Sequence, residues 1–409
     1  MELTELLLYA SIPIVSAIVG WGTNVLAIYM TFYPIEFVGI PPFLGWQGII
    51  PSKARKMASK TVDLMTTKLV GVEEIISRLE AERIAQELKP AVDELLIELI
   101  NEVVNEQSPK IWATVPDSIK QEIYKKAIKD SNEVILQSFI DIQNEIEDIL
   151  DIKRMSIEAL MRDKTFLVDI FLECGKNEFK FIERSGIGFG FLFGLVQMII
   201  WYFYKGSWLL PTAGFLVGWA TNFLALKMIF EPLQPKKIGG FTWQGMFLKR
   251  QEEVSEAYAR MITGQIVSTQ NIINEIFHGP TTQRLLDIIE QHVEEATENF
   301  AGPNEVFFNL IMGTERHRII RERFIKKIVN EVPDGPAMAL TEYADEAMNL
   351  ETTMRERLRA LPPEDFVGLL RPIFQEDEWK LILVGAVLGL LAGLFQLFVV
   401  FGKDIPFIH

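Results

Sequence analysis

Four long apolar runs separate the polar parts of this chain. They cover residues 6–32, 185–204, 209–230 and 381–401, and none of them contains an aspartate or a glutamate. An α-helix rises about 1.5 Å per residue, so roughly 20 residues cross a hydrocarbon core of about 30 Å. Buried helices of soluble proteins rarely stay free of acidic residues over such lengths. The pattern therefore predicts four transmembrane helices.

Two long polar segments, residues 36–184 and 231–378, lie between these runs. Their apolar residues recur at three- and four-residue spacing, as in "VEEIISRLEAERIAQELKPAVDELLIELINEVVNE" from residue 72, where Pro90 is the expected break. No strand alternation or hairpin turn signal is convincing. We therefore expect an all-α membrane protein whose extramembrane helices pack through apolar stripes into a bundle or a coiled arm.

The two halves of the chain repeat one another. "GWGTN" at residues 20–24 returns as "GWATN" at 218–222, which places Asn24 and Asn222 198 positions apart. Two further pairs have nearly the same offset: "GWQG" at 45–48 with "TWQG" at 242–245, and "LFGLVQM" at 192–198 with "LAGLFQL" at 391–397. The pattern predicts two copies of one unit, residues 1–204 and 205–409. Each copy holds two spans, so both enter the membrane in the same orientation, as parallel tandem repeats.

The distribution of basic residues predicts the topology. If all four runs cross the membrane, both polar segments lie on the same side. Basic residues next to the membrane are concentrated on that side, with only Lys205 and Lys403 on the other. The positive-inside rule places both polar segments in the cytoplasm.

Small and amide side chains follow the predicted spans. Small residues recur every four positions, which puts them on one helix face and lets two helix backbones approach closely. A carboxamide in hydrocarbon must find a partner, so we expect amide-to-amide or amide-to-backbone bonds within each copy or between the copies. The alternative is that the amides line a polar path. The candidate packing and intramembrane polar residues are Thr23, Asn24, Gln197, Thr221, Asn222, Gln396, Gly20, Gly218, Gly190, Gly194, Gly389 and Gly393.

A proline and an aromatic, glycine-containing loop follow the first and third runs. The loops read "GIPPFLGWQGIIPSKARK" and "IGGFTWQGMFLKRQ". Tryptophan is enriched where membrane meets water, and cations bind anionic lipid phosphates. The loops therefore predict lipid contact in the headgroup region. The candidate residues are Trp46, Gln47, Lys53, Arg55, Trp243, Gln244, Lys249 and Arg250.

Composition excludes several classes of function. The net charge is −15 over 409 residues, which argues against general nucleic-acid binding because that needs a basic surface. Cys174 is the single cysteine, so no disulfide framework or paired-cysteine site is available, and we expect it to be a packing residue. Glu275 and His278 form one Glu-x-x-His, but a di-iron bundle needs two. We expect no catalytic residue, metal or cofactor.

The combination "GWGTN…F.P…GWQG…P.K", its second copy "GWATN…F.P…WQG…K" and the glycine-rich closing spans resemble the domain-of-unknown-function 445 family. Its YheB-like members are uncharacterised bacterial membrane proteins. The resemblance covers essentially the whole chain and implies a membrane location and a mostly helical fold. It brings no activity and no catalytic residues. One departure is "FLKR" in the second copy where the first has "IPSK", so the second loop is expected to sit differently.

These observations favour a non-enzymatic membrane scaffold whose cytoplasmic helices organise or carry lipid at the inner membrane. The alternative is a transporter or channel for a small solute or lipid, and an enzyme is the third hypothesis. Continuous apolar grooves in the extramembrane helices would favour lipid handling, an amide-lined cavity between the spans would favour transport, and converging carboxylates would favour catalysis. The expected partners are membrane lipids. A second copy of the chain and cytoplasmic proteins that bind the acidic helices are further candidates.

Overall fold

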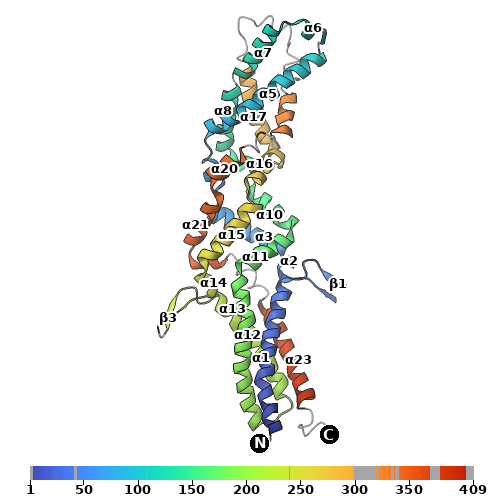
Figure 1. Cartoon of the computed structure of the whole chain (residues 1–409), viewed down its shortest axis with the longest axis vertical. Helices are drawn as coiled ribbons and strands as arrows, with labels where there is room; N and C mark the ends of the chain where they lie inside the picture. Colours follow the sequence, from blue (N-terminus) through green and yellow to red (C-terminus); the bar gives the residue numbers. More distant parts are fainter. Residues whose placement is uncertain are drawn as a thin grey trace. The chain divides into compact units, whose positions relative to one another are not determined.

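The structure, a computed structural model, is built almost entirely of α-helices (Figure 1). It describes residues 3–40, 44–107, 109–129, 131–238, 240–298, 319, 322–328, 330–332, 336, 340–368 and 378–401. The expectation of a mostly helical chain is therefore confirmed. Pro90 does not break its helix as predicted: α5 (Ala81–Gln107) runs through it, because apolar residues on both sides of the proline are buried along the same helix.

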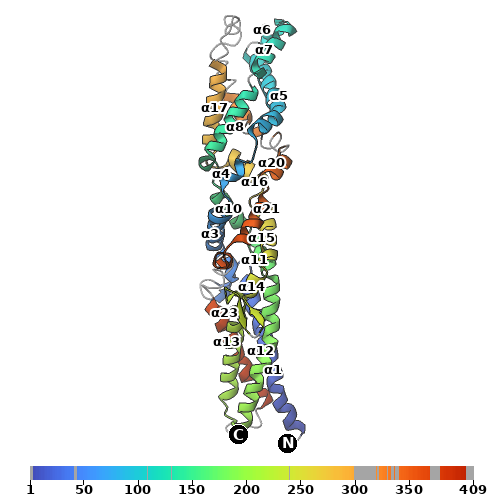
Figure 2. The same cartoon turned by 90° about the vertical axis from the view of Figure 1, so that its left-hand side faces the viewer.

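Four apolar helices lie side by side (Figures 1 and 2). They are α1 (Leu3–Phe32), α12 (Lys176–Phe203), α13 (Leu209–Phe230) and α23 (Glu378–Phe395), the last continuing as a π-helical turn, η2 (Gln396–Val400). Each is long and apolar enough to cross a membrane, so the four predicted runs are confirmed as apolar helices of membrane-spanning length. α12 begins nine residues before the predicted span, because the amphipathic residues that precede the apolar run continue the same helix.

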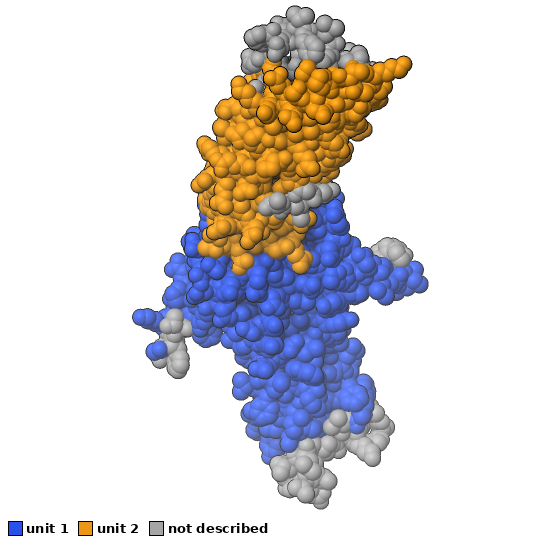
Figure 3. Space-filling view, turned by 45° about the horizontal axis from the view of Figure 1, so that its top comes forward, with its two compact units in different colours: residues 1–64, 157–261, 355–409 blue, residues 65–156, 262–354 orange. Residues whose placement is uncertain are grey.

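The chain forms two compact units, coloured separately in Figure 3. Unit 1 consists of Met1–Leu64, Ile157–Met261 and Arg355–His409, and unit 2 consists of Met65–Ser156 and Ile262–Met354. Each unit takes segments from both halves of the chain. The repeat copies 1–204 and 205–409 divide the chain differently and stay a prediction about its sequence.

Unit 1 contains two β-hairpins that the sequence analysis did not predict. β1 (Val38–Ile40) pairs with β2 (Leu44–Trp46), and β3 (Lys236–Ile238) pairs with β4 (Phe241–Trp243), both antiparallel. The expectation of no strands was wrong because strands of three residues are too short to show an alternating pattern. Each hairpin follows the end of a span, α1 or α13.

Short helices complete unit 1. Asp163 caps one of them, α11 (Lys164–Cys174), by accepting hydrogen bonds from the backbone amides of Thr165 and Phe166. The helices are α2 (Ile49–Ser52), α3 (Ala54–Leu64), α11 (Lys164–Cys174) and α14 (Met246–Lys249), with parts of α10 (Ile152–Arg162), α15 (Gln251–Gln265) and α21 (Leu350–Ala360).

Unit 2 is a helical bundle with contributions from both halves of the chain. α5 packs on α8 (Ser131–Asn144), α8 packs on α17 (Thr282–Glu298), and α16 (Thr269–His278) packs on both α17 and α20 (Thr341–Met348). Ser268 caps α16 by accepting a hydrogen bond from the Asn271 amide, and Asn349 ends α20 in the left-handed conformation. The remaining elements with described bounds are η1 (Met65–Leu69), α4 (Val72–Ile76), α6 (Pro109–Thr114), α7 (Asp117–Lys129) and α9 (Ile146–Ile149).

Candidate functional site

The spans pack in two pairs through their small residues. α1 packs along α12, and α13 packs along α23. Gly20 lies against Gly186, and Gly190 lies against Ser16, so closely that a Cβ atom at any of these glycines would collide with the backbone of the other helix. This close approach is the packing role predicted for Gly20 and Gly190.

The second pair of spans repeats this geometry. Gly218 lies against Gly385, and Gly214 lies against Gly389. The remaining predicted glycines behave in the same way, since a Cβ at Gly194 would meet Pro13 and one at Gly393 would meet Leu210. The small residues therefore lie in the helix–helix contacts of both pairs.

The two asparagines connect the paired spans. Asn24 Nδ2 donates to the backbone oxygen of Ile182 at 2.6 Å, and Asn222 Nδ2 donates to that of Leu381 at 2.8 Å. Of the two expected kinds of bond, the structure has the amide-to-backbone kind. Thr23 and Thr221 bond within their own helices, to the backbone oxygens of Gly20 and Gly218.

The two glutamines lie on another part of the bundle, around a very small space between the spans. Ser16 Oγ donates to Gln197 Oε1 at 3.1 Å, whereas Gln396 Nε2 has no hydrogen-bond partner among the described residues. The space between Gln197 and Gln396 has a volume of about 10 Å³. A cavity needs about 10–15 Å³ to hold one water molecule. In this conformation the amides border a packed seam.

The aromatic loops are held at the ends of the spans by the residues predicted to contact lipid. Trp46 Nε1 donates to the Met30 oxygen at 3.3 Å, Gln47 Nε2 to that of Ile35 at 2.7 Å, and Gln244 Nε2 to that of Leu233 at 3.2 Å. The two glutamines therefore brace the loops. Arg55, Trp243 and Lys249 are exposed and Lys53 is half-buried.

Arg250 has a different role from the predicted lipid contact. Its guanidinium binds both carboxylate oxygens of Glu178, at 2.7 and 3.0 Å, and also pairs with Glu253 at 2.8 Å. The side chain of Glu178 is only 2% exposed, so Arg250 compensates a buried charge. Burial lowers the pKa of Arg250, but the hydrogen bonds and charges of Glu253 and Glu178 raise it above its ordinary value. The guanidinium is thus engaged inside unit 1.

Acidic residues do not converge into a metal site within the described part of the chain. No group of three or more histidines, cysteines, aspartates or glutamates there could hold a metal ion. Glu275, half of the Glu-x-x-His motif, forms an ion pair with Arg154.

The feature of unit 2 that the sequence did not predict is an apolar cavity of about 260 Å³. Its walls come from both halves of the chain, α5 and α8 on one part of the lining and α16, α17 and α20 on another. The lining positions on α8 run from Ser131 to Ile142, which at about 1.5 Å per residue spans roughly 16 Å. The cavity is therefore elongated along the helices.

Polar groups at the cavity are few, and most are engaged. Ser131 bonds to Asp93 and Lys89, and Thr269 bonds to Asp345. Ser138 also lines the cavity; it is 6% exposed, and its hydroxyl has no hydrogen-bond partner among the described residues. The cavity is thus suited to an apolar occupant, with one free hydroxyl in its wall.

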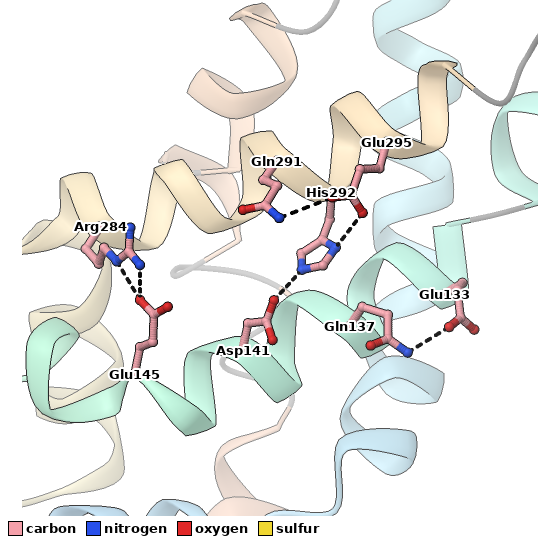
Figure 4. A network of polar contacts seen from close by, with 8 residues as sticks. All are labelled: Glu133, Gln137, Asp141, Glu145, Arg284, Gln291, His292 and Glu295. Atoms are coloured by element: carbon pink, nitrogen blue, oxygen red, sulfur yellow. Dashed lines mark hydrogen bonds and ion pairs between the residues drawn. The ribbon is translucent and has the colours of Figure 1, made fainter.

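Charged and polar side chains connect α8 and the adjoining α9 to α17 and the residue before it (Figure 4). His292 Nε2 lies 2.7 Å from Asp141 Oδ2, and Arg284 pairs with Glu145 at 2.5 Å. Thr281 Oγ1 adds a bond to the Ile149 oxygen at 2.6 Å. Because Ile142 of α8 and Leu285 of α17 both line the cavity, these contacts hold two of its walls together.

Comparison with known proteins supports membrane location and gives no activity. The chain is 30% identical over 86 residues to a UPF0754 membrane protein of Anoxybacillus flavithermus, matching 20% of this chain and 23% of the relative. It is 27% identical over 105 residues to one of Exiguobacterium sibiricum (25% of this chain, 28% of the relative). It is 25% identical over 171 residues to one of Thermosynechococcus vestitus (38% and 41%).

The matched stretches thus span between about a quarter and two fifths of the relatives' lengths. No family model matches the chain, so the resemblance to the domain-of-unknown-function 445 family is not confirmed. No solved structure matches it either. The four apolar helices and these relatives together define the class: a helical membrane protein, similar to an uncharacterised family of bacterial membrane proteins.

Proposed function

We propose that this protein is a membrane-anchored, non-enzymatic scaffold that organises or carries lipid, and that unit 2 binds the acyl tail. The observation that carries the proposal is the apolar cavity of unit 2. The four spans of unit 1 supply the anchor. The basic residues beside the spans support a cytoplasmic position for unit 2, and the resemblance supports the bacterial inner membrane.

The dimensions of the cavity support an acyl tail as its occupant. Each leaflet contributes about half of a hydrocarbon core of about 30 Å, so one tail extends roughly 15 Å. The lining of α8 from Ser131 to Ile142 has nearly this length, roughly 16 Å. An engineered apolar cavity of about 150 Å³ binds benzene. A cavity of 260 Å³ has room for a larger apolar group.

Exchange with the bilayer fits a carrier. Burying a methylene from water is worth about 0.8 kcal/mol, but a tail that comes from the bilayer only exchanges one apolar environment for another. A tail can therefore enter and leave unit 2 without a large change in transfer free energy. The transporter alternative has less support, because the space at Gln197 and Gln396 is only about 10 Å³.

Photocrosslinking tests the proposal. The full chain is placed in nanodiscs that contain phosphatidylglycerol with a diazirine on one acyl tail, and crosslinked peptides are identified by mass spectrometry after irradiation. We expect crosslinks to α8 and α16 in addition to the spans. Ala344→Phe, which fills the cavity, should reduce the crosslinks to α8 and α16 at least fivefold and leave those to the spans unchanged.

Two variants make this experiment decisive. Ala113→Phe adds the same ring at an exposed position of unit 2 and should keep the native pattern. Val134→Trp fills the cavity from a half-buried position and replaces Ala344→Phe if that variant does not fold. Crosslinks confined to the spans in the native chain, or undiminished in folded filled variants, would overturn the proposal.

A further inference from the structure

The β1–β2 hairpin of unit 1 presents an apolar face to its surroundings. Val38 pairs with Trp46, and Ile40 pairs with Leu44. Residues two apart on a strand, and residues paired across strands, share one face of a ribbon, so these four side chains are on the same face. Val38, Ile40 and Leu44 are 64%, 70% and 73% exposed, among the most exposed apolar residues described.

The opposite face of this hairpin carries two glycines. It carries Gly39, whose φ of +137° is favourable to glycine, and Gly45, against which the ring of Phe37 lies. A two-stranded hairpin is marginally stable at best in water. Three large aliphatic side chains on one open face therefore indicate an apolar medium on that side of the ribbon.

The base of the hairpin is fixed at the end of a span. The Gly48 amide donates to the Pro34 oxygen at 2.9 Å, and Trp46 bonds to Met30 in the last turn of α1. α1 ends at Phe32, where the first apolar span also ends. The hairpin therefore begins at the level of the membrane where hydrocarbon gives way to headgroups. The bilayer is the apolar medium nearest to it.

The second hairpin has the same attachment and a different surface. The Gly245 amide donates to the Pro232 oxygen at 3.0 Å, the counterpart of the bond at Gly48. Its register pairs Lys236 with Trp243, and Lys236, Lys237 and Trp243 are all exposed. Cations beside tryptophan suit the headgroup region of an anionic membrane. In Figure 1 the two hairpins project from opposite sides of the helices of unit 1.

We propose that both hairpins lie in the membrane interface: β1–β2 inserts Val38, Ile40 and Leu44 among the lipid tails just below the headgroups, and β3–β4 binds anionic headgroups through Lys236 and Lys237. The occupant of these surfaces is the bilayer around the spans. This inference is independent of the acyl-tail cavity in unit 2 and stands or falls separately.

Site-directed spin labelling measures the depth of the first hairpin. Leu44→Cys is labelled with a nitroxide in full chain reconstituted into vesicles of phosphatidylcholine and phosphatidylglycerol. Cys174 is 1% exposed, so it does not compete for the label in the folded protein. We expect collisions with oxygen to exceed those with a water-soluble nickel chelate several-fold. A label at Asp148→Cys, an exposed position of unit 2, should show the reverse ratio.

Two results would overturn insertion of the first hairpin. One is a label at position 44 that is as accessible to the nickel chelate as the label at position 148. The other is dipolar broadening between labels at position 44 that disappears on dilution with unlabelled protein, because it would show that a second copy covers the face. Ile40→Cys supplies a second label on the same face if Leu44→Cys does not fold.

The second hairpin is tested by its lipid selectivity. In nanodiscs with equal phosphatidylcholine and phosphatidylglycerol, native mass spectrometry counts the phosphatidylglycerol molecules retained by the protein. The double variant Lys236→Gln/Lys237→Gln should retain about half as many as the native chain. The matched variant Lys125→Gln/Lys129→Gln, on exposed positions of α7, should match the native chain. Equal retention by all three proteins would overturn the assignment of Lys236 and Lys237.

Discussion

The spans of unit 1 and the bundle of unit 2 both bury apolar helix faces, but they do so at very different packing densities. Between α1 and α12, glycine backbones touch, and no space remains for a single Cβ atom. Between the walls of unit 2, branched aliphatic side chains surround a space of about 260 Å³. Small residues allow the spans of unit 1 to touch, whereas large residues surround a space in unit 2.

The difference follows from the medium in which each interface forms. Lipid tails are as apolar as leucine, so helices in a bilayer associate through close van der Waals contact and hydrogen bonds, which favour small residues. In water the hydrophobic effect brings large apolar stripes together without requiring that they interlock. A space that remains between such stripes is apolar, and an apolar ligand can fill it.

The largest expected effect comes from placing a large side chain in the close contact between two spans. Gly190→Leu would drive its side chain into the backbone of Ser16 and Ala17. Overpacking typically costs about 1–3 kcal/mol, and the upper end applies where the neighbour is backbone. One kcal/mol shifts the melting temperature of a unit of this size by about 2–4 °C, so we expect a fall of about 6–12 °C in detergent, or loss of the folded protein.

The buried cysteine makes this measurement direct. Burial, with a smaller contribution from the charges of Glu173 and Glu178, raises the pKa of Cys174 to about 12, so a thiol-reactive fluorophore labels it only after unfolding. The control is Gly188→Leu, on the same helix, where a Cβ meets no atom within 4 Å. Equal melting temperatures for the two variants would contradict the role assigned to Gly190.

Hydropathy and spacing were enough to predict four long apolar helices and the rows of small residues along them. Four uninterrupted apolar runs have few alternatives to crossing a membrane, and glycines spaced by four must share a helix face. Asn24 and Asn222 could be placed as fasteners because a carboxamide in hydrocarbon needs a partner. Their partners are the backbone oxygens of Ile182 and Leu381. The choice of these partners depends on the register of the two helices, and a single sequence does not contain that information.

Three features could not be predicted from the sequence: the cavity of unit 2, the two hairpins and the ion pair of Arg250 with Glu178. Each has a physical reason. Helical periodicity identifies which face of α8 or α16 is apolar, but it does not determine how far apart two such faces lie. The hairpin strands are shorter than two periods of alternation. Arg250 reads as a membrane-facing cation until the fold brings the buried Glu178 to it.

A smaller effect is expected from adding an aromatic ring to unit 2, either at the wall of the cavity or in the packed core. Ala344 lines the cavity, whereas Ala85 is fully buried and does not line it. Filling a cavity commonly stabilises by about 0.5–2 kcal/mol, while overpacking costs about 1–3 kcal/mol. Ala344→Phe in delipidated protein should therefore leave the free energy of unfolding unchanged or raise it, and Ala85→Phe should lower it. Chemical denaturation followed by circular dichroism checks both, and equal losses would mean that unit 2 is not hollow at Ala344.

The smallest effect concerns the amide fasteners of the spans. Asn24→Leu removes the bond to the Ile182 oxygen and leaves the glycine contacts intact. Hydrogen bonds between transmembrane helices are worth about 0.6–2 kcal/mol, so we expect a fall of a few degrees in the melting temperature. Asn222→Leu should produce a fall of similar size, because its bond to Leu381 has the same geometry in the other pair. The thiol-labelling melt at Cys174 measures both. No change in either variant would show that the seams hold the spans together without their amides, whereas a fall as large as that of Gly190→Leu would give the amides equal weight with the backbone contact.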